Sequence, residues 1–114
     1  MATIKAYTDL SQSKTLSKII PIETADGGWY ETDNPLAANT EYWLYTKYTE
    51  KAALPAWSLA ALLGVLPRPS LHQDRDKKWY CDAEPNRLYF SSHYDNPVDA
   101  CVDMIEKLNE LKLL

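Results

Sequence analysis

Two histidines and two cysteines are the residues of this chain whose side chains best suit acid–base, nucleophilic or metal chemistry. A catalytic pair needs a base beside a nucleophile, and zinc sites usually show close spacings such as C-x₂-C or H-x₃-H. His72 and His93 lie far apart in the sequence, as do Cys81 and Cys101. We therefore expect ordinary surface or interface histidines, two free thiols in the core and no metal site.

Carboxylates and glycines give no stronger indication of catalysis. Glu23 with Asp26, and Asp95 with Asp99, are pairs that could exchange protons if they were buried together. Turn formation and helix capping explain both pairs without catalysis. The chain has three glycines and no glycine-rich loop that could surround a phosphate. These observations predict a protein that is not an enzyme and needs no cofactor.

Aromatic residues are the most informative group. The chain has eight Tyr and four Trp but one Phe, and Tyr and Trp combine an apolar ring with a polar group that suits interfaces. Trp57 and Trp79 fall in segments that we expect to be buried. Trp29 and Tyr30 stand in a segment rich in Gly, Pro and Asn, where burial is not required. We predict that these two residues contact a partner or ligand.

A group of cations forms a second candidate site. Arg75, Lys77 and Lys78 lie close together and could hold a phosphate while an aromatic ring stacks on a base. A solvated loop explains the same residues. The formal net charge of −4 argues against broad binding of nucleic acid, because affinity for phosphates depends on clustered Lys and Arg.

The N-terminal half is predicted to begin with a helix and to end with a strand. Asp9 to Ile20 has apolar residues at helical spacing, Asp9 or Ser11 could cap its start, and Pro21 follows its end. Turn signals from residue 21 to residue 39 predict a long connection around Trp29 and Tyr30. Tyr42 to Thr49 is rich in β-forming residues, which favours a strand, although a short helix also fits its imperfect alternation.

The C-terminal half is predicted to contain a buried helix, a hairpin and a final helix. Pro55 opens an Ala- and Leu-rich helix to Leu66 that is apolar nearly all round. Segments 78–82 and 87–91 have the composition of two hairpin strands. Asn96 is expected to cap a helix from Pro97 to about Lys112 that packs on this hairpin. The core is expected to include Trp57, Leu59, Leu62, Leu63 and Leu66.

Length and composition predict one globular domain that spans residues 1–114. The chain is 46% hydrophobic and 25% charged, as is usual for such domains. The longest apolar run, Leu59 to Leu66, is much shorter than the roughly 20 residues of a membrane span. The N-terminus lacks the apolar stretch of a signal peptide, so we expect a cytoplasmic protein that does not bind membranes. The predicted elements make an α+β fold, with helices packed on a small, mainly antiparallel sheet.

Three stretches of the chain together resemble a known group of proteins. They are Ala6-Tyr7-Thr8-Asp9-Leu10-Ser11-Gln12-Ser13, Pro55-Ala56-Trp57-Ser58-Leu59-Ala60-Ala61-Leu62-Leu63 and Tyr94-Asp95-Asn96-Pro97-Val98-Asp99-Ala100-Cys101. The chain resembles a family of small uncharacterised proteins of gut Bacteroidales and of their phages and other mobile elements. Its C-terminal half is similar to the phage-type α-β-α sandwich domain, in which a helix, an aromatic hairpin and a final helix follow in this order. The resemblance implies a fold and a genomic setting, and it assigns no activity or catalytic residue.

These observations lead to three functional hypotheses. The first is a non-enzymatic binding protein of phage or mobile-element origin that blocks or sequesters a host protein, for example a defence component. The second is a protein that captures a small nucleotide-type ligand with aromatic residues and the cations of segment 75–78. The third is a small hydrolase-like enzyme, which would need a carboxylate beside His72 or His93. The apolar content is compatible with a homodimer.

Overall fold

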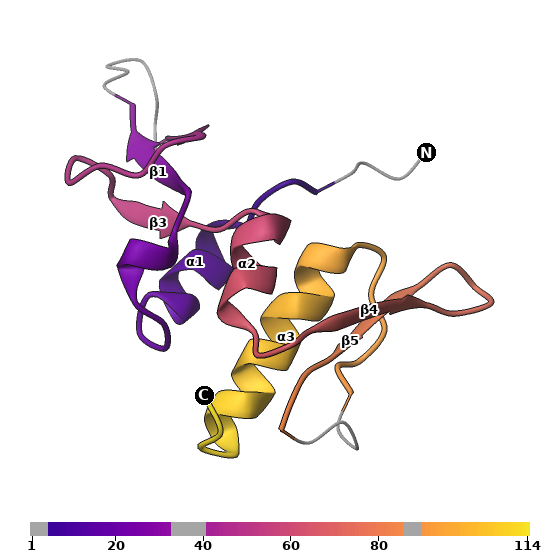
Figure 1. Cartoon of the computed structure of the whole chain (residues 1–114). Coiled ribbons are helices and arrows are strands. Elements are labelled where there is room, and N and C mark those ends of the chain that lie inside the picture. The colour runs from indigo at the N-terminus through magenta and orange to yellow at the C-terminus, as the bar shows by residue number, and fades with distance from the viewer. Residues whose placement is uncertain (1–4, 33–40, 86–89) are drawn as a thin grey trace.

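Residues 5–32, 41–85 and 90–114 are described by a computed structural model of the chain. Within them, three α-helices lie between two small antiparallel sheets (Figure 1). The first sheet has the strand order β2 (Tyr42–Tyr45), β1 (Gly27–Glu31), β3 (Leu54–Ala56), and the second pairs β4 (Ser70–Gln73) with β5 (Trp79–Asp82). This arrangement confirms the predicted α+β class, with two small sheets in place of one.

Helix α1 (Leu10–Leu16) is capped by Asp9, one of the two predicted caps, and ends earlier than predicted. Its start is a capping box, in which the Gln12 N–H donates to Asp9 Oδ1 (2.8 Å) and the Asp9 N–H donates to Gln12 Oε1 (3.1 Å). The helix was expected to reach Ile20. Instead, the N–H groups of Ile19 and Ile20 both donate to the Leu16 carbonyl, so the chain leaves the helix in a tight turn. A short 3₁₀ helix, η1 (Ile22–Thr24), follows.

The predicted long connection contains the central strand of the first sheet, so that expectation is wrong for residues 27–31. Gly27 and Gly28, which suggested a turn, lie inside β1. A Cβ at Gly27 would lie 2.7 Å from the Tyr7 ring, and one at Gly28 would lie 3.0 Å from the Ala52 Cβ. The glycines therefore allow other parts of the chain to lie close to the strand, which is a known use of glycine in sheets. Residues 33–40 of the same segment lie outside the described residues.

Strand β2 confirms the favoured prediction for the start of segment 42–49. It pairs antiparallel with β1, with Tyr30 opposite Trp43 and Gly28 opposite Tyr45. β3 pairs antiparallel with the other side of β1, with Pro55 opposite Gly28. β2 and β3 are therefore the two edges of this sheet.

Helix α2 (Leu59–Val65) begins at Leu59 and not at Pro55, which belongs to β3. Ser58 is its N-cap, because the Ala61 N–H donates to Ser58 Oγ at 3.2 Å. Asp26 holds this cap in place by accepting a hydrogen bond from the Ser58 N–H at 2.8 Å. Local capping thus decides where the strand ends and the helix begins.

The prediction that this helix is buried on all sides is wrong. Leu62 is the one residue of α2 that is buried, while Ala60 and Gly64 are exposed. The segment is made almost entirely of small and apolar residues, but those on the outer side of α2 tolerate contact with water. The inner side of α2 packs against α3, so α2 covers one side of the core.

The predicted hairpin exists with a different partner strand. β5 confirms the strand at 78–82, but it pairs with β4, which lies in a segment expected to be a polar loop. Polar residues of β4 occupy its outer face, which disguised the strand, while Leu71 packs against the core. Phe90 and Tyr94 form isolated bridges to β5. Residues 86–89 of the expected second strand lie outside the described residues.

Helix α3 (Pro97–Glu110) confirms the clearest prediction, and it ends close to the expected residue. The Asp99 N–H donates to the Asn96 side-chain oxygen at 2.9 Å, which caps the helix as predicted. The helix packs on β5 and α2. None of the helices in the described parts of the chain is long and apolar enough to span a membrane.

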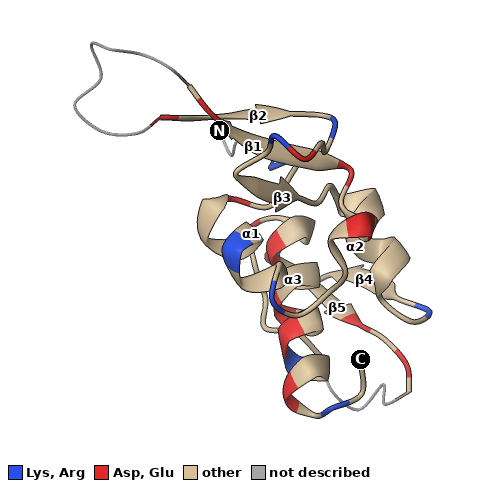
Figure 2. Ribbon diagram, turned by 90° about the vertical axis from the view of Figure 1, so that its left-hand side faces the viewer, with Lys and Arg blue, Asp and Glu red and all other residues tan. Residues whose placement is uncertain are grey.

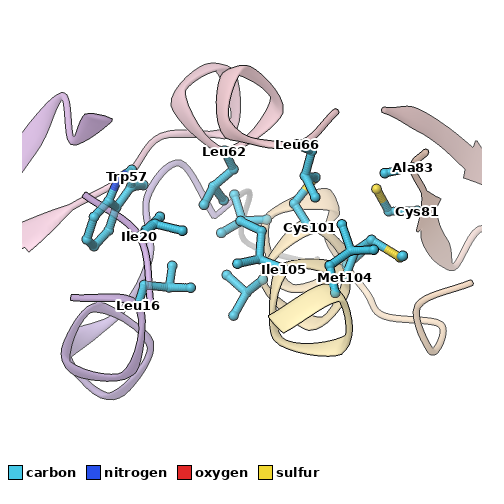
Figure 3. Packing of buried hydrophobic residues seen from close by; sticks show 14 residues of the cluster. Leu16, Ile20, Trp57, Leu62, Leu66, Cys81, Ala83, Cys101, Met104 and Ile105 are labelled. Carbon is cyan, nitrogen blue, oxygen red and sulfur yellow. The ribbon is translucent and has the colours of Figure 1, made fainter. Parts of the chain in front are cut away.

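The core lies between the helices and extends to β5. Figure 3 shows side chains of α1, α2 and α3 directed toward one another, with Trp57 at one end and Cys81 at the other. The prediction is confirmed for Trp57, Leu62 and Leu66, which are buried, while Leu59 and Leu63 are partly buried against the same cluster. The buried Trp57 indole N–H donates to Thr24 Oγ1 at 2.9 Å, so its burial leaves no polar atom unsatisfied.

Candidate functional site

Three aromatic side chains share one face of the first sheet. Tyr30 of β1 lies opposite Trp43 of β2, and Tyr45 lies two residues further along β2. Because side chains alternate between the two faces of a sheet and directly opposite residues share a face, all three rings lie on the same side. We call these three residues the aromatic face.

Tyr30 anchors the aromatic face. Its hydroxyl donates to the Lys47 carbonyl (3.0 Å), accepts from the Thr49 N–H (3.0 Å) and lies 2.9 Å from Thr49 Oγ1. The Tyr30 and Tyr45 rings meet edge to face, with centroids 5.1 Å apart. The same four residues, Tyr30, Tyr45, Lys47 and Thr49, line an open, largely apolar hollow of about 270 Å³. Hydrogen bonds therefore hold the Tyr30 side chain in one position at this hollow.

The other two members of the aromatic face are exposed. Trp43 keeps 57% of its surface accessible to water, and Tyr45 keeps 52%. An edge strand of a small protein usually exposes charged side chains, and large exposed rings are associated with binding surfaces. Sequence reasoning did not select Trp43 or Tyr45. The signal in the sequence is the uncharged run of β-forming residues from Tyr42 to Tyr45. This run contains more large rings than one buried face of a sheet can hold, so some of them must be exposed.

Trp29 and Tyr30, the two aromatic residues predicted to contact a partner or ligand, lie on opposite faces of β1. Tyr30 belongs to the aromatic face. Trp29 is half-buried on the other side, where its indole N–H donates to the Thr8 carbonyl at 3.1 Å. Its strand partners are Leu44 and Leu54. This environment gives Trp29 a structural contact with the N-terminal segment.

A second cluster of rings covers the outer face of the β4–β5 sheet. Tyr80 stacks on His72 (centroids 4.9 Å apart, planes at 20°) and on His93 (4.5 Å, 6°). Phe90, which is exposed, meets Tyr80 edge to face at 5.8 Å. The two histidines, distant in sequence, therefore flank one tyrosine. We call His72, Tyr80 and His93 the ring stack.

Each histidine of the ring stack contacts a carboxylate. His72 Nε2 lies 3.0 Å from Asp82 Oδ2, and His93 Nδ1 lies 2.5 Å from Asp74 Oδ2. The hydrogen bond with His93 is the largest cause that lowers the pKa of Asp74. Such a pair can orient an imidazole as a proton acceptor. The hydrolase hypothesis needs a carboxylate beside His72 or His93, and both histidines have one. Such an enzyme would also need a nucleophile beside the imidazole.

The predicted cations lie in the turn between β4 and β5. Asp74 organises this turn, because its Oδ1 accepts from the N–H groups of Asp76 (2.8 Å) and Lys78 (2.9 Å). Arg75 and Lys77 are exposed, and Lys78 forms an ion pair with Asp95 that raises the pKa of its ammonium group. Carboxylates in and beside the turn therefore offset much of its positive charge.

The structure does not bring the two predicted groups together. Figure 1 shows the turn between β4 and β5 at the opposite end of the molecule from β1, which carries Trp29 and Tyr30. A single site cannot contain both groups. The tyrosine of the same hairpin is Tyr80, which belongs to β5 and stacks on the two histidines.

The two cysteines are free and buried, as predicted. A hydrogen bond with Cys81, together with burial, raises the pKa of the Cys101 thiol well above its usual range. The described residues contain no group of three His, Cys, Asp or Glu side chains arranged to hold a metal ion. Comparisons of the chain with protein-family models, curated proteins and solved structures give no match.

Proposed function

We propose that this protein is a non-enzymatic binding protein that docks another protein on its aromatic face. The observation that supports this proposal is the exposure of Trp43 and Tyr45 on the same face of the sheet as the anchored ring of Tyr30. Tyr and Trp are the residues most enriched among those that dominate binding energy at protein interfaces. The proposal moves the centre of the binding site from Trp29 to β2.

The exposure of these two rings has a free-energy cost that a partner would remove. A buried aromatic side chain removes roughly 150–250 Å² from water, so a ring that stays half exposed leaves about 2 kcal/mol or more of hydrophobic stabilisation unused. Docking a partner would recover this stabilisation for Trp43 and Tyr45. Tyr30 is already fixed by its hydrogen bonds, so little side-chain entropy would be lost there.

The hollow beside the aromatic face suggests the chemistry of the partner. Tyr30, Tyr45, Lys47 and Thr49 line this hollow. An apolar side chain fits such a lining, and a carboxylate next to that side chain would complement the Lys47 ammonium group. We infer a protein partner that presents an apolar residue beside an acidic one.

The biological setting of the proposal rests on the family resemblance. A small binding protein from a phage or mobile element would block or sequester a host protein, and a defence component is one candidate. The nucleotide-type ligand would instead bind at Arg75, Lys77 and Lys78. We favour the protein partner, because Asp74, Asp76 and Asp95 lie in or beside the cationic turn and oppose the binding of phosphate.

The test compares capture of partners by matched surface variants. Tagged wild-type protein, Trp43→Ala, Tyr45→Ala and the control Phe90→Ala would be expressed at equal levels in the native host cell. Phe90 is an exposed aromatic residue outside the aromatic face. We expect a host protein that wild type and Phe90→Ala recover equally and that the other two variants recover at least about tenfold less, as for an interface residue worth about 1.4 kcal/mol or more.

Quantitative mass spectrometry of the recovered proteins provides the readout. Circular dichroism and thermal unfolding would establish that each variant remains folded. Recovery of the same proteins in the same amounts by all four forms would contradict the proposal. Direct binding of the purified partner, measured by calorimetry, would then show whether its affinity depends on Trp43.

A further inference from the structure

We propose that β2 pairs antiparallel with β2 of a second copy of this chain, centred on Leu44, and so joins two three-stranded sheets into one. β2 is an edge of its sheet, and no segment in the described ranges pairs with its outer side. The inference rests on the backbone edge of β2, so it goes beyond the proposed function and does not depend on it.

The pairing with β1 fixes which backbone groups of β2 point outward. The Thr32 N–H donates to the Glu41 carbonyl at 2.9 Å, and the register continues with Tyr30 opposite Trp43. In an antiparallel pair, every second residue directs its N–H and C=O toward the same neighbour. Every second residue from Glu41 onward therefore faces β1. Within β2, the residues that direct their backbone groups outward are Tyr42 and Leu44.

The sequence around Leu44 is self-complementary in this phase. When two copies run antiparallel about Leu44, Leu44 lies opposite its own copy and forms a hydrogen-bonded pair with it. Trp43 then lies opposite Tyr45, twice in the dimer. Lys47 lies in the bend that follows β2, and continuing the register into this bend brings Lys47 of one copy toward Glu41 of the other. Aromatic pairs and opposite charges are the cross-strand pairs that stabilise sheets. Figure 2 shows the β2 ribbon without a charged residue between its two ends.

Charge also selects the direction of pairing. A parallel arrangement in register would place Glu41 beside Glu41 and Lys47 beside Lys47, which is unfavourable. The antiparallel arrangement places each acidic residue beside a basic one. It also has a two-fold axis, so both copies use the same edge and the assembly closes as a dimer without growing into a fibre.

The opposite edge of the sheet is protected, whereas no residue in the described ranges covers the outer side of β2. β3 contains Pro55, which has no N–H to offer to a further strand. Tyr7 and Thr8 lie next to the end of β3, where the Thr8 N–H donates to the Trp57 carbonyl at 3.0 Å. Natural edge strands are usually blocked by proline, bulges or central charges. β2 is short, with four residues, but it has no proline and no charge within Tyr42–Tyr45.

The dimer would also extend the surface used in the proposed function. A two-fold axis perpendicular to the sheet keeps both aromatic faces on the same side. Trp43 of each copy would then lie beside Tyr45 of the other, and one aromatic surface would cross the whole joined sheet. Such a surface suits an elongated or two-fold symmetric partner.

The first test is the oligomeric state of the full chain and of edge variants, measured by sedimentation equilibrium over a concentration series. Leu44→Pro removes the outward N–H at the centre of the pairing and leaves Trp43 and Tyr45 in place. Leu44→Ala keeps this N–H and is the matched control. We expect a concentration-dependent dimer for wild type and Leu44→Ala, and a monomer for Leu44→Pro. Wild-type protein that stays monomeric, or a dimer that Leu44→Pro leaves intact, would overturn the inference.

Charge exchange provides a second test that does not depend on proline. Glu41→Lys and Lys47→Glu each place like charges opposite one another twice in the dimer, so each variant alone should dimerise roughly tenfold more weakly, equivalent to about 1.4 kcal/mol. Mixed in equal amounts, the two variants restore opposite charges at both positions and should form a heterodimer. A mixture no tighter than either variant alone would contradict the antiparallel register.

These outcomes separate the two proposals. Monomeric wild-type protein whose capture of a host protein requires Trp43 would refute the dimer and support the proposed function. A dimer that behaves as described, with no recovered protein that depends on Trp43 or Tyr45, would support the pairing and refute the proposed docking of a partner.

Discussion

The hydroxyl group of Tyr30 should be the most informative single group to remove, because it connects β1 to the segment that follows β2. Tyr30→Phe keeps the ring on the aromatic face and removes three contacts, with the Lys47 carbonyl, the Thr49 N–H and Thr49 Oγ1. One net hydrogen bond contributes about 1 kcal/mol, and the site is half-exposed, so water can replace part of what is lost. We expect a loss of about 1.5 kcal/mol in the free energy of unfolding. For a domain of this length, this corresponds to a melting temperature lower by about 6 °C.

Urea denaturation and amide hydrogen exchange would measure this effect. The control is Tyr45→Phe, which removes a hydroxyl that makes no hydrogen bond within the described residues and should change stability by less than about 0.5 kcal/mol. Exchange of the Thr49 amide should become roughly tenfold faster in Tyr30→Phe, because its acceptor is gone. Equal stability of the two variants, with unchanged exchange at Thr49, would refute the view that Tyr30 anchors the aromatic face.

Three further predictions concern the core and the charges near α3. Leu62→Ala should lower the free energy of unfolding by about 2–5 kcal/mol in urea denaturation, and Leu63→Ala, which is partly buried, should lower it by clearly less. Burial raises the pKa of Asp99, but hydrogen bonds outweigh this effect and leave the pKa below its ordinary value; the donors are Lys5, Gln12 and Asn96. Ionised Asp99 therefore stabilises the fold above the pKa of an unfolded carboxyl group, and this contribution is lost as the pH falls through its folded pKa. In Asp99→Asn, the free energy of unfolding should depend less on pH in the acidic range. Burial raises the pKa of Glu106, so its ionised form opposes folding at neutral pH, and Glu106→Gln should be more stable than wild type there and lose this advantage as the pH falls.

The sequence predicted the elements whose position depends on nearby residues, such as a helix cap or a run of β-forming residues. Asp9 and Asn96 cap helices where their types and positions indicated, and β5 lies where aromatic β-formers are dense. Ser58 shows the limit of this approach. Its role as a cap depends on Asp26, which is distant in the sequence, so Pro55 seemed the better start for the helix.

Elements that depend on distant contacts were not predicted. Gly27 and Gly28 have the composition of a turn, but they lie in a strand that pairs with β2 and β3, where Tyr7 and Ala52 approach them from other parts of the chain. β4 has polar residues on its water-facing side, so nothing in its composition distinguishes it from a loop until β5 is placed beside it. Pairing decides both cases, and a local pattern does not contain the partner.

The same reasoning explains what was missed at the candidate sites. His72, Tyr80 and His93 come from three separate extended segments, and only the fold stacks their rings. Trp29 was selected for its flexible-looking surroundings, although the indole N–H has a partner in Thr8. Residue type identified aromatic chemistry as the feature to follow, but exposure, which decides which ring can bind, is a property of the folded chain.

The edge position of β2 is the strongest reason to connect exposure with binding. A strand that exposes a Trp, a Leu and a Tyr at the edge of a sheet invites uncontrolled pairing, and selection usually removes this risk with a charge or a proline. One substitution in β2 would suffice, since none of its four side chains is buried. The charges lie instead at Glu41 and Lys47, where they leave the centre free and favour one register. Among the described residues this edge has no partner strand, and one substitution could have blocked it, so its uncharged centre favours a role in pairing.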